Sequence, residues 1–202
     1  MKNFNLKIIS ALIYGVIVFS TATISVSAQK IKEQKFSGNI SSLKDQKELN
    51  VVLDFTEMMV NNQPEESHIT YFTNGKDEEY KEKWLNEWNV LMRDDSYNML
   101  IKGLNNSTNK KFQWSLGDFA DAEYTIYVKV INIDPGVFLT KNTRVKADIS
   151  ILKAGEDTPI ATMPFNQYAP KSSYVSIPIG QIAAAFNALG VYVGSNISKS
   201  IK

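Results

Sequence analysis

Three consecutive strand patterns joined by turn signals occupy residues 123–165, and they restrict the possible folds more than any other feature. The first, residues 123–133, is rich in β-branched and aromatic side chains, and the second, residues 144–152, alternates apolar and polar side chains. Such alternation is typical of an antiparallel sheet with one face on a core and the other in solvent. The third, residues 158–165, follows a turn at Gly155 and contains two prolines, which favour an edge position.

Helical periodicity precedes these strands. Aromatic and apolar side chains recur at steps of four, four and three residues and mark one helical face: Tyr80, Trp84, Trp88 and Leu91. Asp77 is suited to the start of this helix, where backbone N–H groups lack partners. Because the pattern loses phase at residues 93–96, one straight helix would carry two apolar faces pointing apart. We therefore expect a break or kink near residues 94–96, with Asp94 or Asp95 capping a second helix.

A further helical pattern covers residues 179–201 and contains many small residues beside its apolar face. Gly190 and Gly194 each lower helix propensity by about 1 kcal/mol relative to alanine, so packing must hold this helix. Small residues allow a close backbone approach to a sheet or to another helix. The same helix is our candidate for a homodimer contact.

Together these patterns predict an α+β fold with two layers. A β-branched run at residues 49–55 indicates a buried strand, and residues 61–76 show no periodicity, which indicates a long loop. The element order is then strand, helices, antiparallel strands and helix, which is typical of a mixed, mostly antiparallel sheet with helices on one face. We expect a single domain over residues 49–202, preceded by a polar lead-in segment at residues 29–48.

Residues 1–28 have the layout of a secretory signal peptide. Two lysines precede an apolar run at residues 8–19, and a small-residue stretch then predicts cleavage between Ala28 and Gln29. The apolar run is shorter than the ~20 residues that a membrane-spanning helix needs. We therefore expect a periplasmic or secreted protein with no membrane span after cleavage.

Composition excludes further classes of function. The chain has no cysteine, so it can form no disulfide framework, thiolate metal site, cysteine nucleophile or lipidated N-terminal cysteine. Without the two lysines of the expected signal peptide, the chain has 20 basic and 21 acidic residues. This nearly neutral net charge gives no positive electrostatic potential that would attract nucleic acid. No phosphate-binding, dinucleotide, zinc-protease or serine-hydrolase motif occurs. We expect no cofactor and no metal.

Candidate chemistry centres on His68, the single histidine, because it is the side chain that titrates near neutral pH. Glu65 and Glu66 lie beside it in sequence, and a hydrolase that uses these acids of the 61–76 loop is one hypothesis. A solvated loop histidine without a catalytic role is the alternative.

Aromatic side chains suggest a second kind of site, since exposed rings can stack on sugars. The candidate ligand-binding residues, besides His68, are Trp84, Trp88, Trp114 and Tyr168. Trp84 and Trp88 lie four residues apart on the helical face that we expect to cover the sheet, so core packing is the alternative. A glycan-binding module is a second hypothesis.

Several segments together carry a resemblance to known proteins. The run at residues 49–55, the helix with Trp84, Trp88 and Arg93, the strand at residues 124–133 and the small-residue helix resemble uncharacterised secreted families of Gram-negative gut bacteria. More distantly, the element order is similar to envelope auxiliary proteins with a TolB N-terminal-like α/β fold. The resemblance covers most of the chain after the signal peptide and assigns no functional residue.

Our leading hypothesis is a non-enzymatic exported protein that binds a protein partner of the cell envelope. It rests on the absence of catalytic motifs, on the small-residue helix and on two expected long loops, residues 61–76 and 166–177. The glycan-binding module and the hydrolase remain as alternatives.

Overall fold

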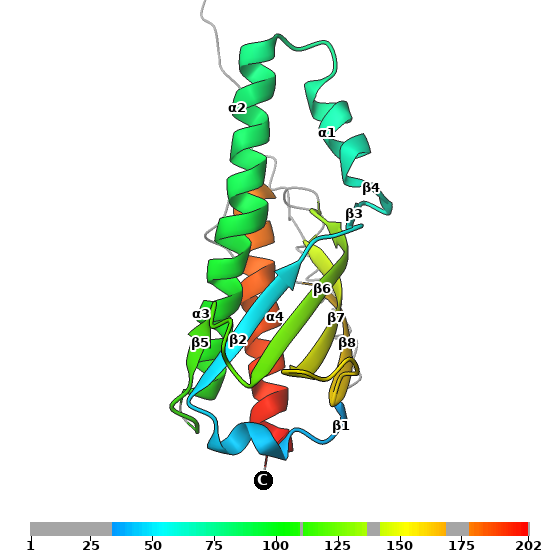
Figure 1. Cartoon of the computed structure of the whole chain (residues 1–202). Helices are drawn as coiled ribbons and strands as arrows, with labels where there is room; N and C mark the ends of the chain where they lie inside the picture. Colours follow the sequence, from blue (N-terminus) through cyan, green and yellow to red (C-terminus); the bar gives the residue numbers. More distant parts are fainter. Residues whose placement is uncertain (1–33, 110, 137–141, 169–177, 202) are drawn as a thin grey trace, which may run out of the picture. The chain divides into compact units, whose positions relative to one another are not determined.

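The described part of the chain forms one compact α+β unit. The computed structural model describes residues 34–109, 111–136, 142–168 and 178–201 (Figure 1). Helices pack on a mixed, mostly antiparallel sheet of eight strands, which confirms the predicted fold class. The helical elements are η1 (Ser41–Asp45), α1 (Glu65–Thr73), α2 (Glu78–Asn89), the π-helical turn η2 (Val90–Asp95), α3 (Ser96–Thr108) and α4 (Pro178–Ser200).

The sheet runs in the order β1-β8-β7-β6-β2-β5, and a short hairpin of β3 and β4 attaches to β6. β6, β7 and β8 pair antiparallel, as predicted, whereas β2 pairs in parallel with both β6 and β5. Buried side chains alternate along β6 and β7, so these strands turn one face to the core. The strands are β1 (Ser37–Gly38), β2 (Glu48–Asp54), β3 (Met59–Val60), β4 (Gln63–Pro64), β5 (Ser115–Gly117), β6 (Tyr124–Asp134), β7 (Arg144–Lys153) and β8 (Ala161–Tyr168).

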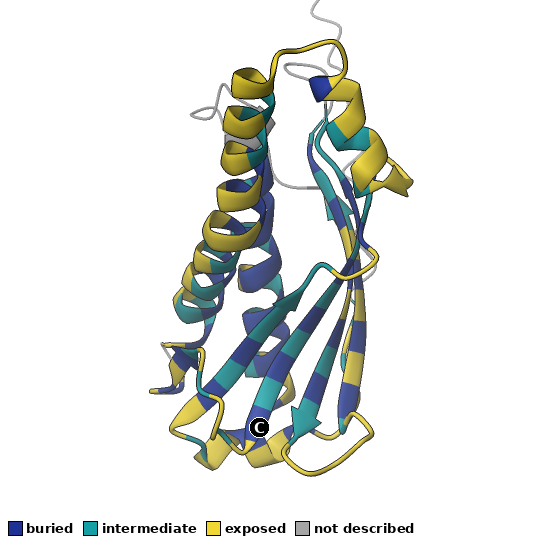
Figure 2. Ribbon diagram, turned by 45° about the horizontal axis from the view of Figure 1, so that its top comes forward, coloured by how far each residue is buried: buried dark blue, intermediate teal, exposed yellow. Residues whose placement is uncertain are grey.

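The hydrophobic core lies between the sheet and the helices. Figure 2 shows buried residues gathered on the sheet and α4, while most of α2 is exposed. Phe186 of α4 is fully buried, and its ring meets Phe55 edge to face with 5.9 Å between centroids. Ile40 and Leu43, which precede the predicted start of the domain, are buried in the same core. Burial of this apolar surface is the main favourable term in folding.

α3 and α4 approach closely at a pair of glycines. Gly103 of α3 faces Gly190 of α4, and a Cβ added at Gly190 would lie 2.3 Å from the Leu100 carbonyl oxygen. Gly194 lies in the same way against Ser107. The prediction of a close backbone approach by the small residues is therefore confirmed, and the neighbour is another helix of the same chain.

The predicted change of helical phase is confirmed, but its form differs from the expected break. The backbone stays helical from α2 to α3, and η2 absorbs the shift with a wider, π-helical turn. Asp95 makes no capping hydrogen bond, so the expected cap by Asp94 or Asp95 is wrong. Ser96 Oγ instead donates to the Leu91 carbonyl oxygen at 3.0 Å, across the wide turn.

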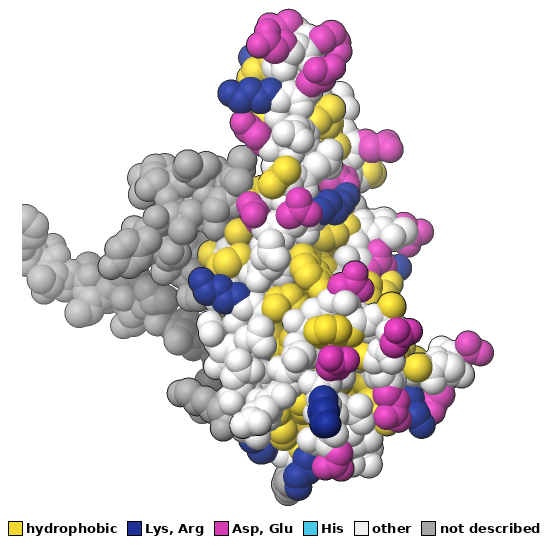
Figure 3. Space-filling model, turned by 60° about the vertical axis from the view of Figure 1, so that its left-hand side comes forward, with side chains coloured by type: hydrophobic (Ala, Val, Ile, Leu, Met, Phe, Trp, Pro, Cys, Tyr) yellow, Lys and Arg dark blue, Asp and Glu magenta, His cyan; other side chains and the backbone are white. Residues whose placement is uncertain are grey.

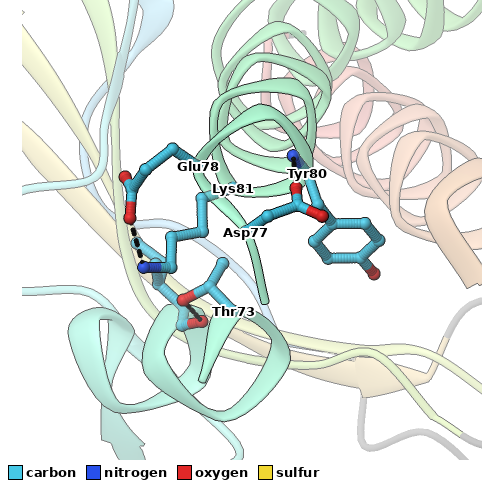
Figure 4. A network of polar contacts seen from close by, with 6 residues as sticks. Thr73, Asp77, Glu78, Tyr80 and Lys81 are labelled. Atoms are coloured by element: carbon cyan, nitrogen blue, oxygen red, sulfur yellow. Dashed lines mark hydrogen bonds and ion pairs between the residues drawn. The ribbon is translucent and has the colours of Figure 1, made fainter. Parts of the chain in front are cut away.

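The prediction of a loop at residues 61–76 is wrong, because most of these residues form β4 and α1. Two glutamates in the first turn of α1 complement the helix dipole, and Thr73 Oγ1 donates to a carbonyl oxygen one turn earlier. Asp77 then caps α2, as predicted, by accepting a 2.8 Å hydrogen bond from the Tyr80 N–H (Figure 4). A helix as short as α1 is marginal alone. Contacts with α2 stabilise α1, and the spacing of apolar residues in the sequence does not predict such contacts between helices.

Two further predictions differ in detail. β8 is not the edge strand, because β1 pairs with Ala161 and Thr162, although this pairing ends before Pro164. Of the loop expected at residues 166–177, the first three residues belong to β8 and the rest lies outside the described residues. Among the helices of the described ranges, none combines the length and the apolar character needed to cross a membrane.

Candidate binding pocket between α1 and α2

A pocket of about 650 Å³ lies between α1, α2 and the β3–β4 hairpin. Its volume is within the usual range for ligand sites. The turn after β6 and Ile182 of α4 complete its walls. The lining side chains from the two helices are Ser67, His68, Tyr71, Phe72, Trp84, Glu87 and Trp88.

The β3–β4 hairpin brings Asn61 and Gln63 to the pocket. Its two turn residues, Asn61 and Asn62, have φ of 54° and 61°, which is typical of a two-residue type I′ turn. Asn62 N–H donates to Asn132 Oδ1 at 2.8 Å, and Asn61 N–H donates to the Ile133 carbonyl oxygen at 2.9 Å. These bonds fix the hairpin to β6, so its polar side chains have a defined place at the pocket.

An aromatic stack joins the two helices. Trp84 lies nearly parallel to Phe72 and to Trp88, with 5.5 Å between ring centroids in each pair and interplanar angles of 13° and 10°. The His68 ring centroid lies 4.9 Å from those of Phe72 and Trp88. Phe72 is exposed and Trp84 is half-buried, whereas Trp88 is almost fully covered. The pocket therefore combines apolar ring surface with a single imidazole.

Glu65 ties α1 to α2 and η2. Its Oε1 accepts a 2.8 Å hydrogen bond from the Trp88 Nε1–H, and its Oε2 pairs with Arg93 at 3.5 Å. Arg93 also lies over the Phe55 ring, with 4.7 Å from the guanidinium carbon to the centroid. Since both carboxylate oxygens are engaged, Glu65 orients the Trp88 indole and holds α1 in place.

The surroundings of His68 favour the uncharged imidazole. Burial among the rings lowers the pKa of His68 from its ordinary value of 6.5, and the nearby Glu65 carboxylate offsets part of this effect. The ring is therefore neutral at pH 7, where it offers one hydrogen-bond donor and one acceptor. This chemistry suits binding of a ligand through ring contacts and a few polar groups.

Stability is expected to fall as the pH drops through about 6.5, the ordinary pKa of histidine. The unfolded chain protonates His68 there, while the folded pocket resists protonation down to its lower pKa. The contribution is thus complete above about pH 6.5 and is lost between the two pKa values. Free energies of unfolding by urea, measured at about pH 7.5 and 5.5, would show the loss. His68→Gln should remove this part of the slope, and an identical slope in both proteins would contradict the assignment.

The structure brings together three of the residues that the sequence pointed to. His68, Trp84 and Trp88 meet in the pocket, although Trp88 is only 4% exposed. Trp114 lies away from it, is buried, and stacks on Phe112 with 4.2 Å between ring centroids. The Tyr168 side chain lies outside the described residues, as do Ala28 and Gln29, the residues of the predicted cleavage site.

Sequence reasoning missed the contribution of α1 and the hairpin. Tyr71 is 79% exposed and Phe72 is 41% exposed at the rim of the pocket, the two largest apolar side chains that α1 shows to solvent. A signal was present, because two adjacent aromatic residues are unusual in a solvated loop. The sequence did not indicate that Asn61 and Gln63 line a pocket, since their position depends on the hydrogen bonds between the hairpin and β6. Within the described ranges, no group of three or more His, Cys, Asp or Glu side chains is placed to hold a metal ion.

Comparison with known proteins leaves this chain without an assigned family. No family model and no curated protein matches it. Among solved structures, it is similar to the PelC dodecamer from Paraburkholderia phytofirmans, with 9% identity, a TM-score of 0.36, and coverage of 81% of this chain and 95% of that chain. A variant of the same PelC gives 9% identity and a TM-score of 0.35 at the same coverage. At such scores the likeness carries no argument about function.

Proposed function

We propose that this chain is a non-enzymatic, exported binding protein of the bacterial envelope, and that the pocket between α1 and α2 is its site for a protein partner. The observation that carries the proposal is the pair Tyr71 and Phe72, exposed at the rim of an aromatic pocket. Aromatic side chains are enriched at protein interfaces, where they bury large areas against a partner. Exposed rings beside a preformed concave surface favour binding as the role of this site.

The chemistry of the pocket supports binding over hydrolysis. Glu65, the acid that contacts the stack through a hydrogen bond, is held by the Trp88 indole and by Arg93. The neutral His68 packs on rings. A general acid–base pair would need one of these groups within reach of a substrate and free to exchange a proton. Their existing partners serve instead to fix the shape of the pocket.

The proposed export rests on the sequence of residues 1–28, whose basic start, apolar run and small-residue end fit a cleaved signal peptide. We place the mature protein in the periplasm or outside the cell, without a lipid anchor. The resemblance to secreted and envelope families of Gram-negative bacteria belongs to the same proposal. A homodimer through α4 would have to use a face such as that of Val191, 39% exposed, because α3 covers the glycines.

Capture from envelope extract of the native cells, with chemical cross-linking and peptide mass spectrometry, tests this proposal. A partner of this site should be recovered by the wild-type protein and lost with the double variant Tyr71→Ser, Phe72→Ser. The matched control is Tyr80→Ser, which removes a ring that is also exposed but lies outside the pocket. Recovery of the same proteins by all three forms would contradict the assignment of this site.

A glycan is the second candidate ligand, because the ring surface of Trp84 lies beside polar side chains of Asn61, Gln63 and Ser67. Rings that stack on a sugar, with amides and hydroxyls that bond its hydroxyl groups, suit carbohydrate recognition. Tryptophan fluorescence titrated with envelope glycans is the measurement. A saturable change that Trp84→Leu removes would favour this candidate over a protein partner.

A further inference from the structure

The charges that line the pocket have one sign. Glu87 is the charged residue among the described lining side chains, and it is exposed. The pocket wall includes no lysine or arginine of the described residues. With His68 neutral at pH 7, the pocket offers ring faces and one carboxylate, and nothing there repels a cation.

The helices around the pocket extend this negative field. Residues 65–89, which span α1 and α2, carry seven acidic residues and three lysines. Lys81 is paired with Glu78 at 2.7 Å, and Lys76 lies over the Tyr80 ring at 5.3 Å. Figure 3 shows acidic side chains gathered at the outer end of this region. Such a surface attracts a basic partner and speeds its encounter.

Ring faces themselves attract cations, because the π-system of an aromatic ring is negative at its face. The described residues already use that attraction in three pairs: Arg93 over Phe55 at 4.7 Å, Lys76 over Tyr80 at 5.3 Å, and Lys111 over Phe112 at 5.1 Å. Trp84 in the pocket belongs to the ring type that binds cations best. The pocket thus joins two features that suit a cation: ring faces and a carboxylate.

We propose that the pocket binds a lysine or arginine side chain of the partner protein. Its aliphatic stem would lie along apolar walls such as Val60 and Ile182, and its charged head would face the rings and Glu87. The volume of about 650 Å³ has room for this side chain together with its neighbours in the partner. The inference rests on the proposed function, because it names the chemistry of the partner at the same site.

Two probes of nearly equal shape test the inference on the purified protein. Nα-acetyl-lysine N-methylamide carries the ammonium group, and the corresponding norleucine compound lacks it. Quenching of tryptophan fluorescence gives the Kd of each. We expect the lysine probe to bind about 3- to 30-fold more tightly, the range that cation–π attraction supplies. Glu87→Gln should reduce this preference, and Glu79→Gln, which is on α2 but outside the pocket lining, should reduce it much less.

Each other outcome overturns the inference in a defined way. Equal or tighter binding of the norleucine probe would assign the pocket to an apolar side chain. Tighter binding of tetramethylammonium than of the lysine probe would assign it to a free organic cation. If the lysine probe gains nothing while cross-linking still recovers a partner that depends on Tyr71 and Phe72, this inference fails and the proposed function stands. Loss of both signals would overturn the proposed function as well.

Discussion

Gly190→Ala is expected to destabilise the protein by about 1–3 kcal/mol, because the added methyl group has no space at the crossing of α3 and α4. The new Cβ would lie 2.3 Å from the Leu100 carbonyl oxygen and 2.8 Å from the Leu104 nitrogen. Both are backbone atoms of a helix, so no flexible side chain can move away. Alanine would by itself favour the helix by about 1 kcal/mol. The measured loss is therefore what remains after that gain.

Gly103→Ala should have a similar cost, since its Cβ would lie 2.2 Å from the Asn187 carbonyl oxygen. The double variant should cost less than the sum, because one separation of the two helices relieves both clashes. Urea unfolding of the wild type and variants gives these values. The control is Gly117→Ala, whose Cβ would meet only Phe119 ring atoms, at 3.4 Å and beyond. A Gly190→Ala protein within 0.5 kcal/mol of the wild type would contradict the close crossing.

The sheet and the terminal helix could be predicted because their patterns are local. The side chains of β6 and β7 alternate in the sequence, and this alternation indicates which face of each strand is buried. The glycines of α4 likewise indicate that another element packs closely against the helix. No local sequence pattern indicates the parallel pairing of β2 with β5 and β6. It depends on how distant segments meet, and hydrophobic period does not encode the order of strands.

The candidate site was predictable only in part for the same reason. Trp84, Trp88 and His68 stand out as rare residue types, but their meeting depends on α1, a short helix with no apolar periodicity. The bond from the Trp88 indole to Glu65 joins residues that are 23 positions apart. Aromatic residues at helical spacing predict a packed face, and they do not tell whether a sheet or a second helix covers it.

The shift of the buried helical face at η2 predicts that single-residue deletions at two places in this helix will differ greatly in their effect on stability. A π-helical turn amounts to one extra residue in an α-helix, so removal of one residue there should restore a regular helix. Asp94 is the choice because its side chain is exposed. In the deletion variant the buried residues Trp88, Leu91, Ser96 and Leu100 would follow one another at steps of three, four and four, a single helical face. We expect its free energy of unfolding within about 1 kcal/mol of the wild type.

Deletion of Lys102, an exposed residue of α3, is the matched comparison and should have a far larger effect. α3 has no extra residue to compensate for a deletion. The loss of one residue there therefore rotates the preceding part of the helix by about 100° relative to the part that follows. Leu100 and Leu104 are both fully buried, so one of them must leave the core. Loss of one such leucine costs about 2–5 kcal/mol, before the disturbance of the α4 contact is added. Urea unfolding followed by circular dichroism compares the two deletions. Equal damage from both would show that the wide turn of η2 is required for the fold, and that it is not simply an insertion into one continuous helix.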